Sequence, residues 1–291
     1  MTEFLTSFLL TCVLAYFGKK TGFLDHPSSR KTHRKAVPPV GGIALFLTLL
    51  MFERDNPIFL YSTPMFVLGL FDDLFDLSYR LKLIVTGLVS LWFVVSASTD
   101  TFIFGLEVHP VFLLVWLAGM MNAFNVIDGL DGLLGGISIV SSFLIGEKSL
   151  AFSLLGFLPM NLPPARVFLG NNGAFFVGAF LSMSTVRFFH GDVGFATLFL
   201  GLPFYEIVFS FLRRVVSGRN PFSADELHIH HVFSRKLGKW RALILLVAFS
   251  FLFNLLGLTE KFHVLFLFLL LCGVLFLSYS MFQSSDCNLD L

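Results

Sequence analysis

The sequence predicts an all-α polytopic membrane protein, and three observations support that prediction. Apolar residues make up 56% of the 291 positions and charged residues only 13%, about half of the ~25% typical of soluble domains. The mean hydropathy is +0.82. Apolar runs long enough to cross a bilayer recur along the whole chain, so we expect one membrane domain over residues 1–291. The net charge of +1 gives no reason to expect nucleic-acid binding.

Eleven stretches are candidate spans, because a helix needs about 20 mostly apolar residues to cross the hydrocarbon, and somewhat fewer when polar ends reach the head groups. They lie at 2–18, 38–53, 57–72, 81–98, 109–126, 132–147, 149–162, 172–189, 195–213, 241–258 and 261–282. The first stretch lacks a preceding basic region and a following cleavage site, which favours a retained helix over a signal peptide. Residues 101–108 alternate around Gly105 and predict a small hairpin on the outer surface.

The basic residues orient these spans. Alternate loops place 16 of the 20 Lys and Arg residues on one side and 4 on the other. Excess Lys and Arg in short loops marks the cytoplasmic side, so the N-terminus is predicted outside and the C-terminus in the cytoplasm. Acidic residues cluster in motif-like stretches on the basic side but are scattered on the outer side. The clusters suggest a cytoplasmic site for phosphates and a metal.

The first cytoplasmic loop carries several basic residues, Lys35 among them, and is followed by Pro-Pro-Val-Gly-Gly at 38–42. One interpretation is a positive-inside anchor that touches anionic lipid head groups. The other is a phosphate-binding arm, in which the glycines let the backbone approach a ligand closely. The loop alone leaves both open.

The third span ends in an acidic stretch, residues 69–76. In a helix, Asp72 and Asp76 share one face, and Asp73 lies about 100° around from Asp72. Adjacent carboxylates at a helix C-terminus are unfavourable unless something neutralises them. A hard divalent cation such as Mg2+, carrying substrate phosphates, would do so, and Lys82 is placed to contact the same phosphate.

Two further stretches combine amides and carboxylates with glycines. Around the end of the fifth span, Asn122 precedes Asn125, Asp128 and Asp131, which recur every three residues within reach of one ligand. A solvated turn is the alternative, but a turn does not need these residues interleaved with large apolar ones. The eighth span begins at 170–173 with Asn171, where a helix N-terminus favours anions or is simply a capped turn.

The longest cytoplasmic loop contains Arg214 and three histidines, His228, His230 and His231. A zinc site is one interpretation, but no Cys lies nearby. We favour hydrogen bonding of phosphates by imidazoles backed by arginines. Glu206, inside the ninth span, is an intramembrane acid and therefore a functional or pairing residue by default.

Together these stretches resemble the polyprenyl-phosphate N-acetylhexosamine-1-phosphate transferase family, in the family's order, from Asp25 to about His231. Residues 69–76 look like its acidic motif, 122–136 like its Asn/Asp-rich motif, and 225–231 like its histidine motif. The form His-x-His-His after Arg-x-Asn-Pro-Phe is similar to the branch that transfers N-acetylglucosamine-1-phosphate. The branch that transfers phospho-muramoyl-pentapeptide carries a different histidine loop.

The resemblance implies that a UDP-N-acetylhexosamine, UDP-N-acetylglucosamine foremost, donates its sugar-1-phosphate to undecaprenyl phosphate with release of UMP. This reaction would begin a cell-envelope polysaccharide at the cytoplasmic face of the inner membrane. The implied cofactor is Mg2+, or Mn2+, and the implied partners are the two substrates and the lipid bilayer, with a homodimer left open. Phosphoryl transfer mainly requires positioning and neutralisation of charge, which suits carboxylates, a metal and cationic side chains.

The resemblance also implies roles for single residues. The implied catalytic residues are Asp72, Asp73, Asp128, His230 and His231, with Asp72 orienting or deprotonating the lipid phosphate. The implied substrate-binding residues are Lys35, Lys82, Asn122, Asn125, Asp131, Asn171, Arg214 and His228. The implied metal ligands are Asp72, Asp73, Asp128 and Asn171. Two positions depart from the family, since Asn171 and Glu206 stand where it usually or often has Asp, and Asn171 brings no charge to the metal.

Other functions fit parts of the pattern. Intramembrane prenyltransferases need aspartates four apart after an Asn, but Asp128 and Asp131 are three apart. CDP-alcohol phosphotransferases need an Ala-Arg after Asp-Gly, and none follows Gly129. A lipid or ion transporter would place polar residues near mid-membrane on broken helices, whereas these motifs are predicted at one face.

Overall fold

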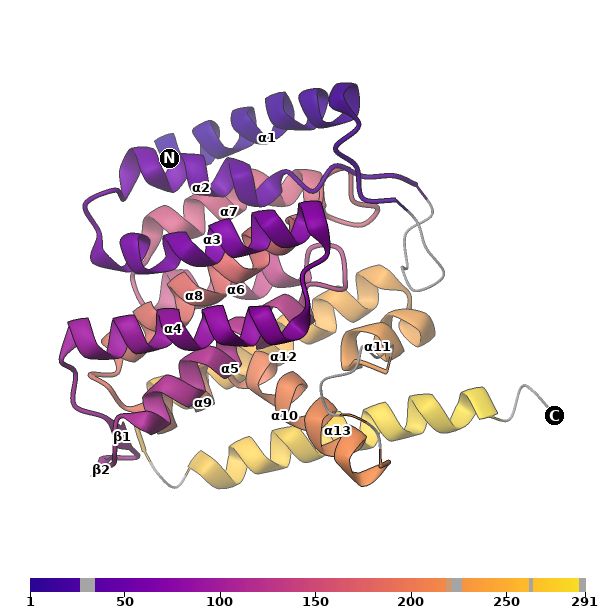
Figure 1. Cartoon of the computed structure of the whole chain (residues 1–291). Coiled ribbons are helices and arrows are strands. Elements are labelled where there is room, and N and C mark those ends of the chain that lie inside the picture. Colours follow the sequence, from indigo (N-terminus) through magenta and orange to yellow (C-terminus); the bar gives the residue numbers. More distant parts are fainter. Residues whose placement is uncertain (27–34, 219, 221–226, 262–263, 288–291) are drawn as a thin grey trace.

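A computed structural model describes residues 1–26, 35–218, 220, 227–261 and 264–287 (Figure 1). Over these residues the chain forms thirteen helices and one two-stranded hairpin. In order they are α1 (Thr2–Thr21), α2 (Gly41–Phe52), α3 (Pro57–Phe75), α4 (Tyr79–Ala97), β1 (Phe102–Ile103), β2 (Leu106–Glu107), α5 (Val111–Ile127), α6 (Leu133–Leu144), α7 (Lys148–Asn161), α8 (Gly170–Phe188), α9 (Val193–Phe199), α10 (Gly201–Val216), α11 (Ile229–Leu237), α12 (Lys239–Leu258) and α13 (Leu265–Cys287).

The predicted helical stretches are present, with two differences. The ninth stretch is not one straight span, because it is broken at Leu200 into α9 and α10, whose axes differ by 94°. The long loop after α10 contains a helix, α11, that the sequence analysis did not predict. The predicted hairpin is confirmed, with Phe102 opposite Glu107 in antiparallel pairing.

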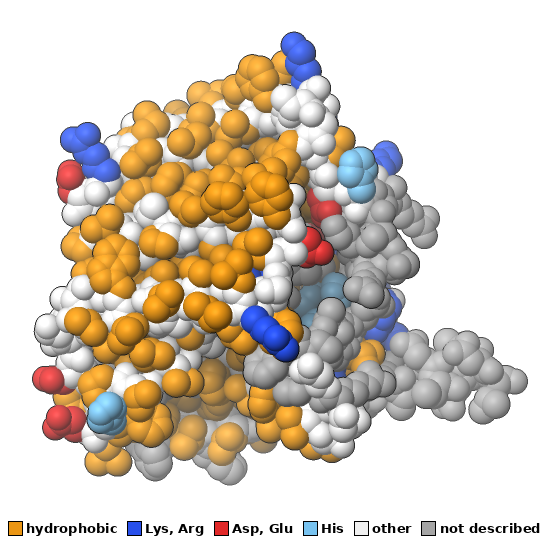
Figure 2. All heavy atoms as spheres, viewed as in Figure 1, with side chains coloured by type: hydrophobic (Ala, Val, Ile, Leu, Met, Phe, Trp, Pro, Cys, Tyr) orange, Lys and Arg blue, Asp and Glu red, His pale blue; other side chains and the backbone are white. Residues whose placement is uncertain are grey.

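Apolar side chains cover much of the outer surface. Three of the described helices, α3, α4 and α12, are long and apolar enough to cross a membrane, or four spans if the bent pair α9–α10 counts as one. Shorter apolar helices are α2, α5, α6 and residues 267–280 of α13. Figure 2 shows hydrophobic side chains over the middle of the visible face, with charged side chains toward its two ends. This surface suits lipid, while eleven crossings and their orientation stay predictions.

Helix α8 forms the centre of the bundle, and every residue from Asn172 to Val186 is buried. Glycines let α2 and α3 approach its first turn. A Cβ at Gly69 would lie 2.3 Å from the Asn171 carbonyl oxygen, and one at Gly42 would lie 2.1 Å from Asn172 Oδ1. The glycines at 41–42 pack against α7 and α8, so helix packing explains their lack of side chains, and the approach of a ligand to this backbone stays a prediction.

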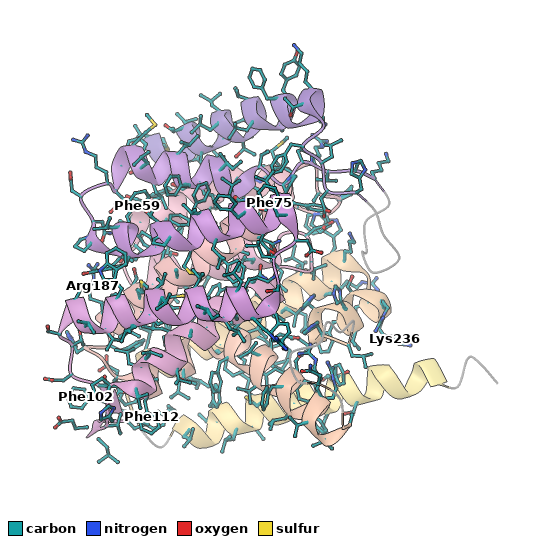
Figure 3. All side chains as sticks on the ribbon, viewed as in Figure 1. Phe59, Phe75, Phe102, Phe112, Arg187 and Lys236 are labelled. Atoms are coloured by element: carbon teal, nitrogen blue, oxygen red, sulfur yellow. The ribbon has the colours of Figure 1, made fainter. Side chains whose placement is uncertain are left out.

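The two ends of the bundle differ in what they carry. Figure 3 places Phe75 and Lys236 toward one end, and Arg187 and Phe102 toward the other. The C-terminus of α3 and the N-terminus of α8 meet at the Phe75 end, since Asp73 of α3 accepts a hydrogen bond from the Asn171 backbone N–H. The motifs predicted on the cytoplasmic side are therefore brought to one end of the molecule.

Candidate active site

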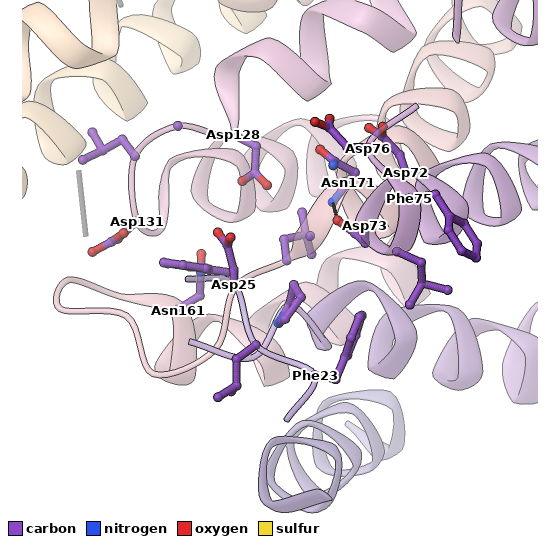
Figure 4. Close-up of a pocket in the computed structure, with 18 of the residues that line it drawn as sticks. Phe23, Asp25, Asp72, Asp73, Phe75, Asp76, Asp128, Asp131, Asn161 and Asn171 are labelled. Carbon is purple, nitrogen blue, oxygen red and sulfur yellow. Dashed lines mark hydrogen bonds between the residues drawn. The ribbon is translucent and has the colours of Figure 1, made fainter. Parts of the chain in front are cut away.

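A polar cavity with a volume of about 950 Å3 opens at the end of the bundle where α3 ends and α8 begins. Aspartates from three segments line it, namely Asp25, Asp72, Asp73, Asp76, Asp128 and Asp131. Figure 4 shows Asn171 beside Asp72, Asp73 and Asp76, with Asp128, Asp131 and Asp25 on the other side of the space. The acidic motif and the Asn/Asp-rich motif, distant in sequence, thus face one cavity.

Asp72 is paired with Lys82. The Lys82 ammonium donates to both carboxylate oxygens of Asp72, at 3.0 and 3.2 Å, and the Leu77 backbone N–H donates to Asp72 Oδ1 at 2.8 Å. Lys82 belongs to the first turn of α4, which follows α3 after a short loop. The carboxylate at the negative end of α3 is thereby neutralised by a cation from the next helix.

Asp73 caps the N-terminus of α8. Its Oδ1 accepts from the Asn171 N–H at 2.9 Å, and its Oδ2 accepts from the Asn172 N–H at 3.0 Å and from the Asn172 side-chain amide. The sequence left two interpretations of this helix N-terminus, an anion site and a capped turn. The anion it holds is the protein's own Asp73, which ties α3 to α8.

Asp128 directly follows α5 and has no hydrogen-bond or ion-pair partner among the described residues. Burial, followed by repulsion from Asp73 and then Asp131, raises the pKa of Asp128 well above its usual range. A carboxylate perturbed in this way inside a polar cavity is typical of a functional site. A bound cation would favour its charged form.

Asp131 is paired with Lys239, the first residue of α12. The Lys239 ammonium donates to Asp131 Oδ2 at 2.9 Å, and the Ala165 backbone N–H donates to the same oxygen at 3.3 Å. Lys239 is not among the predicted site residues. In the sequence, only its position shortly after the histidine motif indicates a role at the site.

The three histidines lie at the start of α11. His228 Nδ1 lies 2.6 Å from Glu206 Oε1, and His228 Nε2 lies 3.5 Å from the Arg214 guanidinium. His230 is fully buried, and burial, followed by repulsion from His231 and His228, lowers the pKa of His230 well below its usual range. The His230 ring is therefore neutral at pH 7, while His231 lines the cavity.

Gly129 brings the histidines against the aspartate loop. A Cβ at this position would lie 2.2 Å from His230 Nε2 and 3.0 Å from His231 Cε1. Any side chain here would push α11 away from the loop that carries Asp128 and Asp131. The Asn/Asp-rich and histidine motifs therefore form one surface.

Several predicted site residues do not line the cavity. Asn122 on α5 donates to Thr86 Oγ1 of α4 at 3.3 Å, so its amide joins two helices. Asn125 Oδ1 is buried and accepts no hydrogen bond from the described residues. Lys35 is exposed on the loop before α2. The Arg214 guanidinium lies 3.5 Å from His228 Nε2, which connects it to the histidine motif. Their roles in substrate binding stay predictions.

Parts of two predicted motifs lie outside the described residues. They are residues 27–34 of the first cytoplasmic loop and 225–226 of the histidine motif.

The donor chemistry of the cavity fits a hard divalent cation, although no three acidic, His or Cys side chains of the described residues converge on one point. Carboxylate and amide oxygens are the ligands that Mg2+ prefers. Asp128 and Asn171 both line the cavity, and Asp128 has no protein cation to neutralise it within the described structure. Asp73 fits less well as a ligand, because its oxygens are engaged by α8.

Comparisons with known proteins agree with the motifs. A family model described as Glycosyl transferase family 4 matches residues 57–189, from α3 through α8. Undecaprenyl-phosphate alpha-N-acetylglucosaminyl 1-phosphate transferase of Thermotoga maritima is 62% identical over 291 residues, covering 100% of both chains. The chain belongs to glycosyl transferase family 4. The predicted family resemblance is thereby confirmed.

Two more distant relatives have the same or a similar name. A Bacillus subtilis protein named "Probable undecaprenyl-phosphate N-acetylglucosaminyl 1-phosphate transferase" is 30% identical, over 94% of this chain and 87% of its own. An Escherichia coli K12 undecaprenyl-phosphate alpha-N-acetylglucosaminyl 1-phosphate transferase is 29% identical, over 80% of this chain and 76% of its own. The family 4 match at 57–189 contains Asp72, Asp128 and Asn171, which this glycosyl transferase family 4 protein places around one cavity.

Proposed function

We propose that this protein transfers N-acetylglucosamine-1-phosphate from UDP-N-acetylglucosamine to undecaprenyl phosphate, producing undecaprenyl-diphosphate-N-acetylglucosamine and UMP. The observation that carries this proposal is the identity of 62%, over the full length of both chains, to the Thermotoga maritima transferase of that name. The product would begin a cell-envelope polysaccharide. The carboxylate-lined cavity supports the proposal, because phosphoryl transfer depends on positioning and on neutralising charge.

The chemistry needs two anionic substrates to meet. A phosphate oxygen of the lipid attacks the phosphorus that bears the sugar, and the bond from that phosphorus to the oxygen of UMP breaks. The Asp72–Lys82 pair would hold the lipid phosphate, with the ammonium attracting it and Asp72 taking a proton from its protonated form. The loop around Asp131 and the imidazole of His231 would position the nucleotide sugar from the other side of the cavity, with the buried His230 ring behind them.

A divalent cation completes this proposal. Asp128 and Asn171 would hold Mg2+, or Mn2+, and Asp72 would join them by giving up part of its pairing with Lys82. The cation would supply the positive charge that lets the two phosphorylated substrates approach. The distribution of lysines supports this, since Lys82 and Lys239 pair with Asp72 and Asp131 but Asp128 has no such partner in the described structure. Asp73 would act by positioning α8 instead of binding the cation.

The proposed membrane arrangement has eleven crossings, with the N-terminus outside and the C-terminus and active site on the cytoplasmic side of the inner membrane. The distribution of 16 basic residues on one predicted side and 4 on the other supports it. The cavity aspartates all lie at one end of the bundle, which favours an enzyme at a membrane face over a transporter with a mid-membrane site.

The test is transfer of radiolabel from a panel of UDP-sugars into an organic-extractable lipid by purified protein with undecaprenyl phosphate. We expect label from UDP-N-acetylglucosamine, release of UMP, and loss of both in Asp72→Asn. Glu107→Gln, an exposed change in the hairpin, should transfer normally. Faster transfer from another UDP-N-acetylhexosamine would reassign the sugar, and absence of transfer from every UDP-sugar would refute the proposed function.

A further inference from the structure

Glu206 is a fully buried carboxylate on α10 that does not line the cavity. A buried carboxylate is costly unless hydrogen bonds satisfy its oxygens. Glu206 Oε1 lies 2.6 Å from His228 Nδ1 and accepts from the Ser210 hydroxyl at 3.4 Å. The Ile229 backbone N–H donates to both Glu206 oxygens, at 3.3 and 3.2 Å. These partners connect α10 to the beginning of α11.

The first consequence concerns the tautomer of His228. A carboxylate only accepts hydrogen bonds, so the 2.6 Å contact with Glu206 places a proton on His228 Nδ1. The Ser210 hydroxyl, 3.1 Å from the same nitrogen, can donate to Glu206 Oε1 in this arrangement. The opposite nitrogen, Nε2, lies 3.5 Å from the Arg214 guanidinium, which only donates. Glu206 and Arg214 therefore select the same tautomer of His228 from opposite sides of the ring, with the proton on Nδ1.

The second consequence concerns the first turn of α11. The N-cap residue, His228, makes no side-chain capping hydrogen bond of its own. The first N–H groups of a helix need acceptors, and a negative charge at this end is favourable. Glu206 supplies both, from a different helix, through the Ile229 N–H. The position at which α11 starts is thus fixed by α10.

The third consequence reaches the cavity. The rings of His228 and His230 are stacked, with centroids 5.6 Å apart and planes within 10°. The His230 ring also lies 4.2 Å from that of His231 and packs against Gly129, where no Cβ would fit. A shift of His228 or of the α11 start would therefore move the two imidazoles that face the aspartate loop.

We propose that Glu206 is a positioning residue: by accepting from His228 Nδ1 and from the Ile229 N–H, it fixes the tautomer of His228 and holds His230 and His231 against the Asp128–Asp131 loop. The assignment deepens the proposed function and depends on it for its kinetic part. It gives Glu206 a role through the histidines, without contact with either substrate.

The kinetic test compares Glu206→Gln with wild type. Glutamine keeps the size of the side chain but replaces one acceptor oxygen with a donor, so it cannot satisfy both His228 Nδ1–H and the Ile229 N–H in the same way. We expect kcat/KM for the UDP-sugar to fall about 10- to 100-fold, as for other residues that orient functional imidazoles. KM for undecaprenyl phosphate should stay unchanged, because Asp72 and Lys82 are untouched. Glu206→Asp should recover part of the loss.

A matched control is Glu147→Gln, which removes a carboxylate that pairs with Arg187 at 3.2 Å, far from the histidines in sequence and outside the cavity. Its kinetics should match wild type. A double variant, Glu206→Gln with His228→Asn, should be no less active than the less active of the two single variants, because both changes act through one imidazole. Losses that multiply, or a Glu206→Gln protein with wild-type kinetics, would overturn the proposal.

A measurement independent of activity separates this proposal from the proposed function. In protein with 15N-labelled histidine, the His228 signal, assigned by its absence from His228→Asn, should show the proton on Nδ1. Glu206→Gln should lose that signature while the protein remains folded by thermal melting. A wild-type His228 with its proton on Nε2 alone would refute the role of Glu206, even in an active transferase. Wild-type protein that transfers no sugar phosphate but shows the Nδ1–H signature would refute only the function.

Discussion

Asp73 faces three hydrogen-bond donors of α8, so both its charge and its two acceptor oxygens matter. In Asp73→Asn, the new amide group would point at a backbone N–H, which leaves buried donors without acceptors and costs about 1–3 kcal/mol. We expect a lower thermal midpoint and at least ~100-fold slower transfer, because Asn171 and the start of α8 would shift. Asp55→Asn is the control, since that side chain is 94% exposed. Unchanged melting and turnover in Asp73→Asn would contradict the capping role.

Gly129 permits the contact between the aspartate loop and His230, so Gly129→Ala tests that contact directly. The added methyl would lie 2.2 Å from His230 Nε2, and the loop and α11 would have to separate. We expect transfer to fall at least ~10-fold, a loss equal to about 1.4 kcal/mol in the activation barrier. Gly87→Ala on α4 is a matched control, because a Cβ there meets nothing within 4 Å and alanine favours helix. Normal activity in Gly129→Ala would show that the two motifs can work apart.

Asp128 has its pKa raised by burial and by two neighbouring aspartates, which makes it the residue most sensitive to a cation. Adding Mg2+ to purified protein should raise the thermal midpoint, by about 2–4 °C for each kcal/mol of binding free energy. Asp128→Asn should abolish this shift and leave the metal-free midpoint equal or higher, because a buried like-charge interaction is gone. Chelation should stop transfer. Normal turnover in excess chelator would disprove the metal assignment.

At the scale of elements, the Asp131–Lys239 pair joins the loop after α5 to the beginning of α12. Lys239→Met should raise KM for the UDP-sugar several-fold, because the loop loses its attachment while an uncompensated buried carboxylate remains. The exchanged variant, Asp131→Lys with Lys239→Asp, should have a higher thermal midpoint than a protein that carries either change alone. Additive losses in the exchanged variant would mean that the two side chains act independently.

Helix positions could be predicted because lipid exposure demands long apolar runs, and these are local in sequence. The break at Leu200 was missed even though Gly201 and Pro203 follow it, because an apolar window does not register residues that weaken or interrupt helical hydrogen bonding. Helix α11 was missed because it is only 9 residues long and its polar positions resemble a loop.

The cavity aspartates could be predicted because they cluster in sequence, whereas their partners could not. Which cation neutralises Asp131, and which donors engage Asp73, depends on the helix ends that meet across the bundle. Those meetings depend on non-local packing, such as the approach of Gly69 to the first turn of α8. The same limit applies to Glu206, whose isolated position in an apolar span indicated a partner without naming it.

At the scale of the whole molecule, the bundle has one end with the cavity and another with the hairpin, and the proposed topology places the membrane between them. In a protein whose three native cysteines are replaced, we expect Lys20→Cys and Arg235→Cys to react with an impermeant maleimide only in inverted vesicles. Glu107→Cys should react only in intact spheroplasts. Each variant should first be shown to transfer sugar phosphate. Reaction of all three positions from one side would rule out the predicted crossing of the bilayer.

The lysine–aspartate pairs flanking the cavity also bear on how an anion would bind there. Lys82 and Lys239 are already engaged, so a polyanion that enters the cavity finds no unoccupied ammonium in either pair and several carboxylates that repel it. Any phosphate, whether of a substrate or of an abundant nucleotide such as ATP, would have to displace a carboxylate to bind either ammonium. A phosphate that takes either ammonium therefore releases the carboxylate of Asp72 or Asp131, so binding of the substrate phosphates would free these oxygens in the same step.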